Sequence, residues 1–193
     1  MGKVPVSAPA EEPVTLAEVK AFMRVDTGEE DAKITSLIVS ARRAFEHHTN
    51  RALVAQGWRL DLDSFPCGEP ICIPHGPVSE VTEITYYDSA NDLQTLEAAD
   101  YQVEGLPLDA PRITPSVMAW SWPPVQPQLG CVKVAYTAGY GAAADVPDDV
   151  KFAIMAMVAH WFSQAEGASA SQTFAVPLHL EMLLNAHRIP LLA

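Results

Sequence analysis

The sequence contains few cysteines and no long apolar run, and both absences exclude classes of protein. Its three cysteines are an odd number in a chain of 193 residues, so we predict no disulfide framework and a reduced, intracellular setting. No stretch of roughly 18 consecutive apolar residues occurs, which excludes a membrane-spanning helix. Residues 1–13 contain no apolar run typical of a secretory signal, so no membrane partner is expected.

Basic residues are also scarce. The chain has 12 Lys and Arg against 24 Asp and Glu, which gives a formal net charge of −12. Because an acidic surface repels phosphate, a protein that grips nucleic acid by its backbone is not expected. The charge does not exclude a protein that surrounds DNA without holding it. The hydrophobic content of 49% is sufficient for a core, and the length suggests one domain or a core with long arms.

No motif for catalysis or metal binding is complete. Cys67, Cys72 and His75 have the spacing C-x4-C-x2-H, but a structural zinc site needs four ligands and no fourth is nearby. The turn at 139–141 lies between a predicted strand and a predicted helix, a place where phosphates bind, but it lacks the glycine patterns of nucleotide-binding loops. We therefore predict no catalytic residue, no cofactor and no metal, and we do not expect an enzyme.

Two capping-box patterns mark the beginnings of helices. Thr15 and Glu18 have the S/T-x-x-E spacing, and Thr27 and Glu30 repeat it. Apolar residues recur at three- to four-residue spacing after each box. The sequence therefore predicts a helical hairpin over residues 14–56 with one buried face.

The apolar period then changes to two, which is the period of a strand. Trp58, Leu60 and Leu62 alternate with charged residues, a pattern typical of a half-buried strand. We expect an antiparallel, β-rich portion over 57–141. Further strands are predicted at 71–73, 78–87, 101–103 and 132–136.

A proline-rich segment over 105–130 interrupts these strands and is predicted to be a loop. Trp120 and Trp122 lie in it among several prolines. We expect these two aromatic residues to pack or to contact a partner rather than to stack on nucleic acid bases.

The helix predicted over 146–166 has no polar face. Between Val150 and Phe162 only Lys151 and His160 are polar, and at about 100° per residue they lie on opposite sides. A helix that is apolar all round is buried on every side. Part of its surface is therefore expected to meet another chain, and a long loop of the same chain is the alternative cover. The candidates for a subunit interface are Phe152, Met155, Ala159 and Trp161.

Both ends of the chain are predicted to be extended arms. Residues 1–13, rich in proline, alanine and glutamate, are expected to be flexible. Residues 167–193 are expected to form a small, polar hinge followed by an apolar docking arm. The alternative is that this arm folds back on its own core. The candidates for docking on a partner are Val176, Leu180, Leu183, Leu184, Arg188 and Ile189.

Three blocks of sequence follow one another in order along residues 13–190. They are PVTLAEVK at 13–20 with TNRAL at 49–53, YTAGYG at 136–141 with VPDDV at 146–150, and VP at 176–177 ahead of HR at 187–188. Together they resemble the head–tail connector (adaptor) proteins of long-tailed phages and of phage-derived gene transfer agents. Each block alone is common, whereas their order and spacing are characteristic of that family.

The residue patterns and this resemblance together predict an α+β connector core over 14–166. Its helical body consists of the N-terminal hairpin and the long helix, beside the antiparallel β portion and the terminal arms. The resemblance further implies a homo-oligomeric ring of about twelve copies, closed by interfaces that join two different faces of each copy. The place that it implies is the neck of a phage or phage-like particle, assembled in the bacterial cytoplasm.

The resemblance also implies partners and a function. The ring is expected to join the portal protein of the capsid to a stopper or tail-completion protein and to extend the DNA channel. DNA is expected to pass without sequence-specific binding. One alternative is a tail-terminator or neck protein that contacts the tail tube. Another is a small phage-associated hydrolase, which would need a pocket that joins titratable groups.

Overall fold

The computed structural model describes residues 2–68, 70–106, 109–116, 121–126, 128–166 and 178–189. These residues form two compact units, which we call the β unit and the helical unit. The connector core predicted over 14–166 contributes to both units, and the sheets and the helices each enclose apolar residues of their own. The β unit is built from residues 2–10 and 55–139, and the helical unit from residues 11–54 and 140–189.

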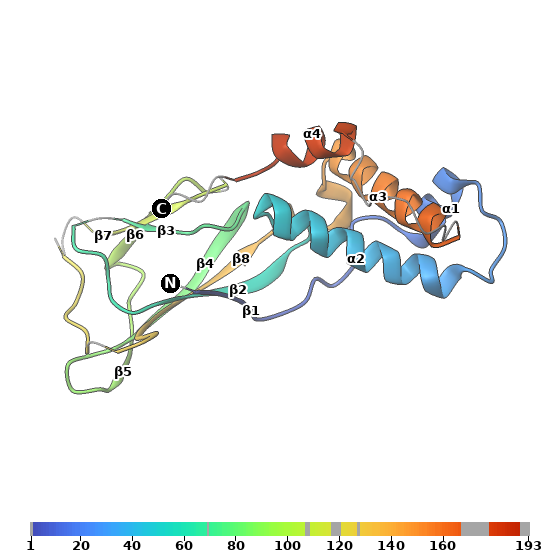
Figure 1. Cartoon of the computed structure of the whole chain (residues 1–193). Helices are drawn as coiled ribbons and strands as arrows, with labels where there is room; N and C mark the ends of the chain where they lie inside the picture. The colour runs from blue at the N-terminus through green and yellow to red at the C-terminus, as the bar shows by residue number, and fades with distance from the viewer. Residues whose placement is uncertain are drawn as a thin grey trace. The chain divides into compact units, whose positions relative to one another are not determined.

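The β unit consists of antiparallel sheets (Figure 1). Five strands pair in the order β1-β2-β8-β4-β5, and three pair in the order β3-β7-β6. The prediction of an α+β fold with antiparallel strands is thereby confirmed. The strands are β1 (Gly2–Pro5), β2 (Gln56–Leu62), β3 (Ile71–Cys72), β4 (Val78–Tyr87), β5 (Leu93–Thr95), β6 (Tyr101–Glu104), β7 (Arg112–Pro115) and β8 (Val132–Ala138).

Strand β8 lies at the centre of the larger sheet because every second side chain on it is apolar. Val132, Val134, Tyr136 and Ala138 are buried, and the residues between them are half-buried. Leu60 of β2 is fully buried and lies opposite Val134 in the β2–β8 register. The period of two that predicted these strands therefore also identifies the face that they bury.

Strand β7 lies inside the segment that was predicted to be a loop. Ile113 is fully buried and pairs in register with Ile71 of β3 and Val103 of β6. Pro111 and Pro115 stand on either side of Ile113, so the strand is too short to show an alternating pattern.

Part of the predicted N-terminal arm, residues 2–7, pairs with the larger sheet. Gly2–Pro5 forms β1, whose four residues pair antiparallel with β2. The backbone N–H of Val6 continues this contact by donating to the Gly57 carbonyl at 2.8 Å. The physical reason is that main-chain pairing at a sheet edge needs an extended segment, whatever its side chains.

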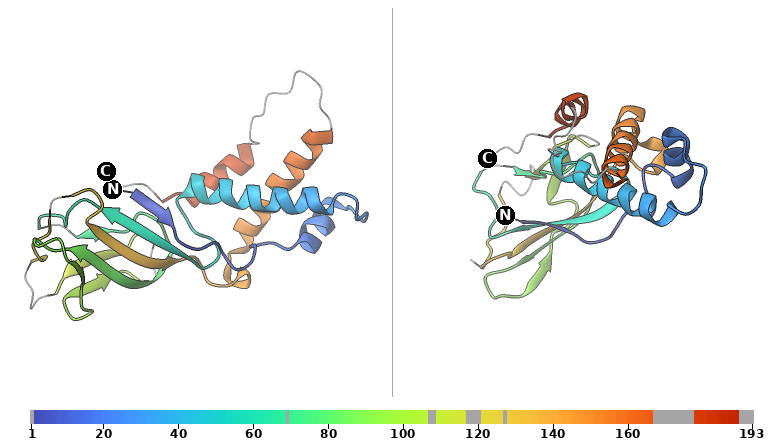
Figure 2. Two further views of the ribbon diagram at one scale, coloured as in Figure 1. Left: turned by 90° about the horizontal axis from the view of Figure 1, so that it is seen from below. Right: turned by 45° about the vertical axis from the view of Figure 1, so that its right-hand side comes forward.

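The helical unit is formed around α2 and α3. These two helices pack more extensively on each other than any other pair of helices, and Figure 2 shows them crossing. The predicted hairpin is therefore one part of a larger cluster. Among the described residues, no helix combines the length and the apolar character needed to cross a bilayer. The helices are α1 (Leu16–Met23), α2 (Asp31–Thr49), the 3-10 helix η1 (Ala143–Asp145), α3 (Asp148–Glu166) and α4 (Leu178–Ala186).

The first predicted capping box is confirmed at the beginning of α1. The Thr15 backbone N–H donates to Glu18 Oε2 at 2.7 Å, and the Glu18 backbone N–H donates to Thr15 Oγ1 at 3.2 Å. Two N–H groups that the helix itself cannot satisfy thus gain acceptors. Thr15 Oγ1 also donates to Glu18 Oε2 at 2.7 Å. This bond and the one from the Thr15 N–H lower the pKa of Glu18, although partial burial opposes this.

The second predicted box, at Thr27 and Glu30, is wrong. Helix α2 begins at Asp31, and no side chain caps it. Lys20 instead holds this turn, because its ammonium group donates to the Thr27 carbonyl at 2.8 Å and to Asp31 Oδ1 at 2.6 Å.

Candidate assembly surfaces

Helix α3 has one side buried in the helical unit and one side partly open. Val150, Ala153, Ile154 and Val158 are fully buried. Phe152 on the other side is 44% exposed, and Met155, Ala156 and Ala159 are half-buried. The described residues therefore cover only part of a helix whose sequence predicts burial on every side.

An aromatic pair stands at the open side of α3. Phe22 of α1 meets Phe152 edge to face, with ring centroids 5.9 Å apart and an interplanar angle of 83°. Phe22 is itself 42% exposed. At about 100° per residue, Met155 and Ala159 lie on the same side of α3 as Phe152. We call Phe22, Phe152, Met155 and Ala159 the α1–α3 apolar face.

Phe22 is a residue that the sequence prediction missed. The apolar stripe of α1 consists of Leu16, Val19 and Met23, and Phe22 lies beside this stripe. An aromatic residue outside the buried stripe of an amphipathic helix is the signal that could have identified it.

Trp161 does not belong to this face, which corrects its grouping with the other interface candidates. It lies nine residues after Phe152, which is about half a turn away around the helix. Helical geometry places Trp161 on the same side of α3 as the buried Val150 and Ile154, where it is half-buried. The four predicted residues therefore cannot all contact one partner surface.

Most of the predicted docking arm lies in the chain's own core. Leu180, Leu184 and Ile189 are 1%, 6% and 4% exposed, and Leu180 and Leu184 belong to the apolar cluster of the helical unit. This corrects the prediction that they dock on another protein, and it agrees with the alternative that the arm folds back. Of the remaining candidates, Leu183 is half-buried and Arg188 is exposed, while Val176 lies outside the described residues.

Polar contacts hold the end of this segment in place. The Ile189 backbone N–H donates to the Thr49 carbonyl at 2.8 Å, and Arg51 Nε donates to the His187 carbonyl at 2.5 Å. His187 Nε2 lies 2.8 Å from Asp149 Oδ2. Burial alone would raise the pKa of the Asp149 carboxyl, but the hydrogen bond and charge of His187, together with backbone N–H donors such as that of Val150, lower that pKa.

These contacts bring together the three sequence blocks that carry the family resemblance. Thr49 and Arg51 come from the first block, Asp149 from the second and His187 from the third. Arg51 also reaches the Tyr140 hydroxyl of the second block, with its Nη1 at 3.4 Å. We call this meeting place the block junction, and its role is to fasten the end of the chain to α2 and α3.

The residues considered for metal or phosphate binding have other surroundings. Cys67 is exposed and Cys72 is half-buried, whereas His75 packs on Trp58 with ring centroids 4.2 Å apart. Within the described parts of the chain, no group of three or more His, Cys, Asp and Glu could hold a metal ion. At the turn over 139–141, the N–H of the next residue, Ala142, already donates to an aspartate carboxylate at 2.9 Å.

The described residues thus form an α+β fold with an exposed apolar face on the helical unit. The family model of the head completion proteins matches residues 12–189, and the chain therefore belongs to that family. The match confirms the resemblance to head–tail connectors and indicates a structural role in the neck of a phage-like particle. No curated protein sequence matches the chain.

Solved structures agree with this assignment. The chain is 27% identical to a chain of the neck of an empty gene transfer agent particle, computed with C6 symmetry, with a TM-score of 0.79. It is 27% identical to a chain of the virion of a native gene transfer agent particle, with a TM-score of 0.78. Each match covers 100% of this chain and 98% of the other. A chain from a native neck computed with C12 symmetry, 23% identical with a TM-score of 0.75, shows the same fold.

Proposed function

We propose that this chain is a ring-forming adaptor that joins the capsid portal to the tail neck and extends the DNA channel of a phage-like particle. Its family and its likeness to chains of gene transfer agent particles support this proposal. The observation that carries it is the exposed pair of Phe22 and Phe152 on the α1–α3 apolar face.

The α1–α3 apolar face is one half of the proposed contact between neighbouring copies. A closed ring needs two different faces on each copy, one of which meets the other on the next copy. Aromatic side chains at the centre of an interface contribute most to its free energy of association. Phe22 and Phe152 already contact each other edge to face, which lowers the conformational entropy lost when a neighbour covers them.

The portal contact is assigned to the outer side of α4 and the residues after it. Met182 is 67% exposed, Arg188 is exposed and Leu183 is half-buried. Because Leu180 and Leu184 are part of the core, the segment docks while remaining attached to its own helical unit. The stopper or tail-completion protein then binds the other end of the ring.

The acidic character of the chain fits a channel that lets DNA pass. Acidic residues outnumber basic residues in both the β unit and the helical unit. A lumen with this charge repels phosphate rather than binding it. DNA therefore slides through the ring without sequence-specific contact.

The ring contact is tested by a substitution that places one charge on the α1–α3 apolar face. Purified chain is added to portal-containing particles that lack it, and the number of bound copies per particle is measured. Phe152→Asp is expected to reduce bound copies at least roughly tenfold, because a carboxylate is buried without a partner at the contact. Leu129→Asp is the matched control, since Leu129 is 90% exposed and lies in the β unit.

The fold of both variants is checked by circular dichroism and thermal melting. Normal binding of a folded Phe152→Asp protein would show that the α1–α3 apolar face is not the ring contact. If the wild-type chain bound isolated tails and not portal-containing particles, its function would be that of a tail terminator rather than an adaptor.

A further inference from the structure

Strand β5 is an open edge of the larger sheet in the β unit. It pairs with β4 on one side and is the last strand in the order β1-β2-β8-β4-β5. All three of its residues are exposed. The main-chain groups on its outer side are therefore available to bond a further strand.

The alternation of the β4–β5 ladder identifies the groups that point outward. The Leu96 backbone N–H donates to the Ile84 carbonyl at 2.8 Å, so these two residues form a hydrogen-bonded pair. Such pairs alternate with pairs whose main-chain groups point away from the partner strand. In the β4–β5 register, Leu93 and Thr95 belong to the second kind. Each of them offers one N–H and one carbonyl to the outer edge.

The opposite edge of the sheet, formed by β1, is protected against pairing, whereas β5 is not. Strand β1 contains Lys3 and Pro5, and proteins use lysine and proline on edge strands to prevent the addition of another strand. Pro5 also has no N–H to donate. Strand β5 consists of Leu93, Gln94 and Thr95, none of which blocks an edge. Of these two edges, β5 is therefore the one that can accept a strand.

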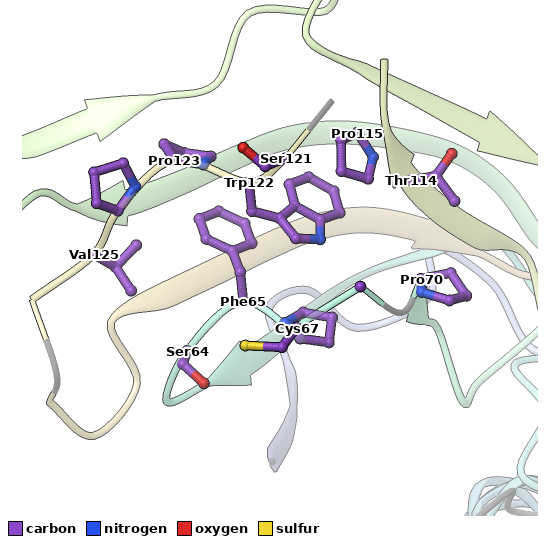
Figure 3. Close-up of a pocket in the computed structure, with 13 residues that line it drawn as sticks. Ser64, Phe65, Cys67, Pro70, Thr114, Pro115, Ser121, Trp122, Pro123 and Val125 are labelled. Carbon is purple, nitrogen blue, oxygen red and sulfur yellow. The ribbon is translucent and has the colours of Figure 1, made fainter. Parts of the chain in front are cut away.

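On the side of Tyr86, the apolar surface of the β4–β5 hairpin is already covered by the chain itself. Tyr86 meets Phe65 edge to face, with ring centroids 5.7 Å apart. Phe65 in turn stacks on Trp122 with ring centroids 4.8 Å apart, and Figure 3 shows the two rings side by side. A strand added to β5 therefore finds its apolar contacts on the other face of the hairpin.

That other face carries exposed apolar side chains. Leu93 lies opposite Tyr87 in the β4–β5 register and is 58% exposed. Leu129 is 90% exposed, and it lines a surface hollow together with Tyr87 and Asn91. Because Asn91 lies two residues before Leu93, the beginning of β5 is flanked by two leucines that the described residues leave exposed.

The charge around β5 defines a complementary partner. Residues 88–100 contain four acidic residues and no basic one. Gln94 Nε2 donates to Asp88 Oδ2 at 2.9 Å, which places this carboxylate on the Gln94 side of the strand. Successive side chains of a strand point to opposite faces, so the Gln94 side is acidic and the Leu93 side is apolar. On the Leu93 side, Lys133 lies over the Tyr87 ring, so a partner's cations are favoured only on the Gln94 side.

We propose that the edge of β5 binds an extended, basic segment of another protein as an added strand. The main chain of this segment bonds the outward N–H and carbonyl groups of Leu93 and Thr95. Its apolar side chains contact Leu93, and its alternate lysine or arginine side chains lie on the Gln94 side near Asp88. Because β5 is short, these side-chain contacts add to few main-chain bonds. The contact rests on the β unit alone and not on the ring or portal contacts proposed above.

The experiment is an NMR titration of the full chain with an N-acetylated, C-amidated nonapeptide of alternating lysine and valine. The salt concentration is about 0.15 M, which screens distant charges. The backbone N–H signals of Leu93 and Thr95 are expected to move and saturate, and their hydrogen exchange is expected to slow, because both groups gain acceptors. The Lys3 N–H on the opposite edge is the internal control, and its signal is expected to stay in place.

The matched variants place the same charge at the two edges. Leu93→Lys is expected to weaken peptide binding about tenfold, because an apolar contact is lost and a like charge is added. Val6→Lys is the control, since Val6 is 65% exposed and follows β1 at the opposite edge. It changes the net charge equally and is expected to leave the affinity unchanged. A nonapeptide of alternating glutamate and valine is expected not to bind, because the acidic residues around β5 repel it.

Three results would overturn the proposal. They are Leu93 and Thr95 signals that do not move at millimolar peptide, equal binding of the glutamate–valine peptide, and equal effects of Leu93→Lys and Val6→Lys. Binding of Leu93→Lys to portal-containing particles is measured in parallel and is expected to be normal, whereas folded Phe152→Asp is expected to bind the lysine–valine peptide normally. Failure of the strand contact is thereby distinguished from failure of the adaptor function.

Discussion

Arg42 is a charged side chain within the helical unit, where it is 5% exposed. Its guanidinium donates to Glu12 Oε2 and Glu46 Oε2, each at 2.7 Å. Burial alone would lower the pKa of Arg42, but these carboxylates raise it. Because removal of one partner leaves a buried charge uncompensated, Arg42→Leu is expected to lower the free energy of unfolding by about 3–5 kcal/mol. Urea denaturation measures this loss.

Arg43 provides the matched control for that prediction. It is an exposed neighbour on the same helix, so Arg43→Leu is expected to change stability by less than about 0.5 kcal/mol. The double variant Arg42→Leu, Glu46→Leu is expected to recover part of the loss, since the buried negative charge of Glu46 is removed together with the arginine. If Arg42→Leu and Arg43→Leu lowered the free energy of unfolding equally, the ion pairs of Arg42 would not be the cause of its stabilising effect.

Asp149 gives a prediction about pH. Its pKa lies below the ordinary value of 3.8 because of His187. The stabilisation from this contact is therefore present above that value and is lost as pH falls through the lower value in the folded protein. In His187→Ala the pKa of Asp149 is expected to rise, since the hydrogen bond and charge of His187 no longer oppose burial, although the Val150 N–H still does. Carbon NMR of the carboxyl group reports the shift, and an unchanged pKa would refute the role given to His187.

At the scale of single residues, the sequence predicts that an apolar side chain will be covered. It does not predict whether the chain itself or a partner covers that side chain. Phe152 was expected at an interface and is exposed in the chain, as such a residue must be. Trp161 was grouped with it, although helical geometry places the two on opposite sides. Leu180 was assigned to a partner, but the nearest apolar surface is its own core.

The capping box of α1 leads to a prediction at the scale of the element. Thr15→Ala is expected to lower the free energy of unfolding by about 1 kcal/mol, because the Glu18 N–H loses its acceptor. The pKa of Glu18 is also expected to rise, since one of the hydrogen bonds that lower it is lost. Denaturation and an NMR titration provide the two measurements.

Thr27 is the control for this prediction, because it has the same spacing to a glutamate but caps no helix. Thr27→Ala is expected to change stability by less than about 0.5 kcal/mol. A loss as large as that of Thr15→Ala would mean that the sequence pattern, rather than the observed hydrogen bonds, decides stability.

Elements with strong periodicity could be predicted, and short paired ones could not. The patterns around β2, β8 and α3 extend over several turns or alternations, so each predicts its own type of structure. Strands β1 and β7 exist because a neighbouring strand pairs with them. Their pairing depends on residues distant in the sequence, and no local pattern encodes it.

At the scale of the whole molecule, the block junction explains why separated stretches of sequence identify the family. Arg51 and His187 are 136 residues apart and share a hydrogen bond. The order and the spacing of the blocks could be read from the sequence. That the blocks meet at one place could not. Because this segment also contributes to the core, deleting the C-terminal residues would disturb the fold as well as any portal contact. A point substitution such as Met182→Asp therefore tests portal docking without removing core residues.

High-resolution cryo-imaging of the assembled neck tests the central claim most directly. We expect a closed ring of this chain at the portal, with Phe22 and Phe152 buried against the neighbouring copy. A ring in which both side chains face solvent, or a neck in which the chain is absent, would contradict it.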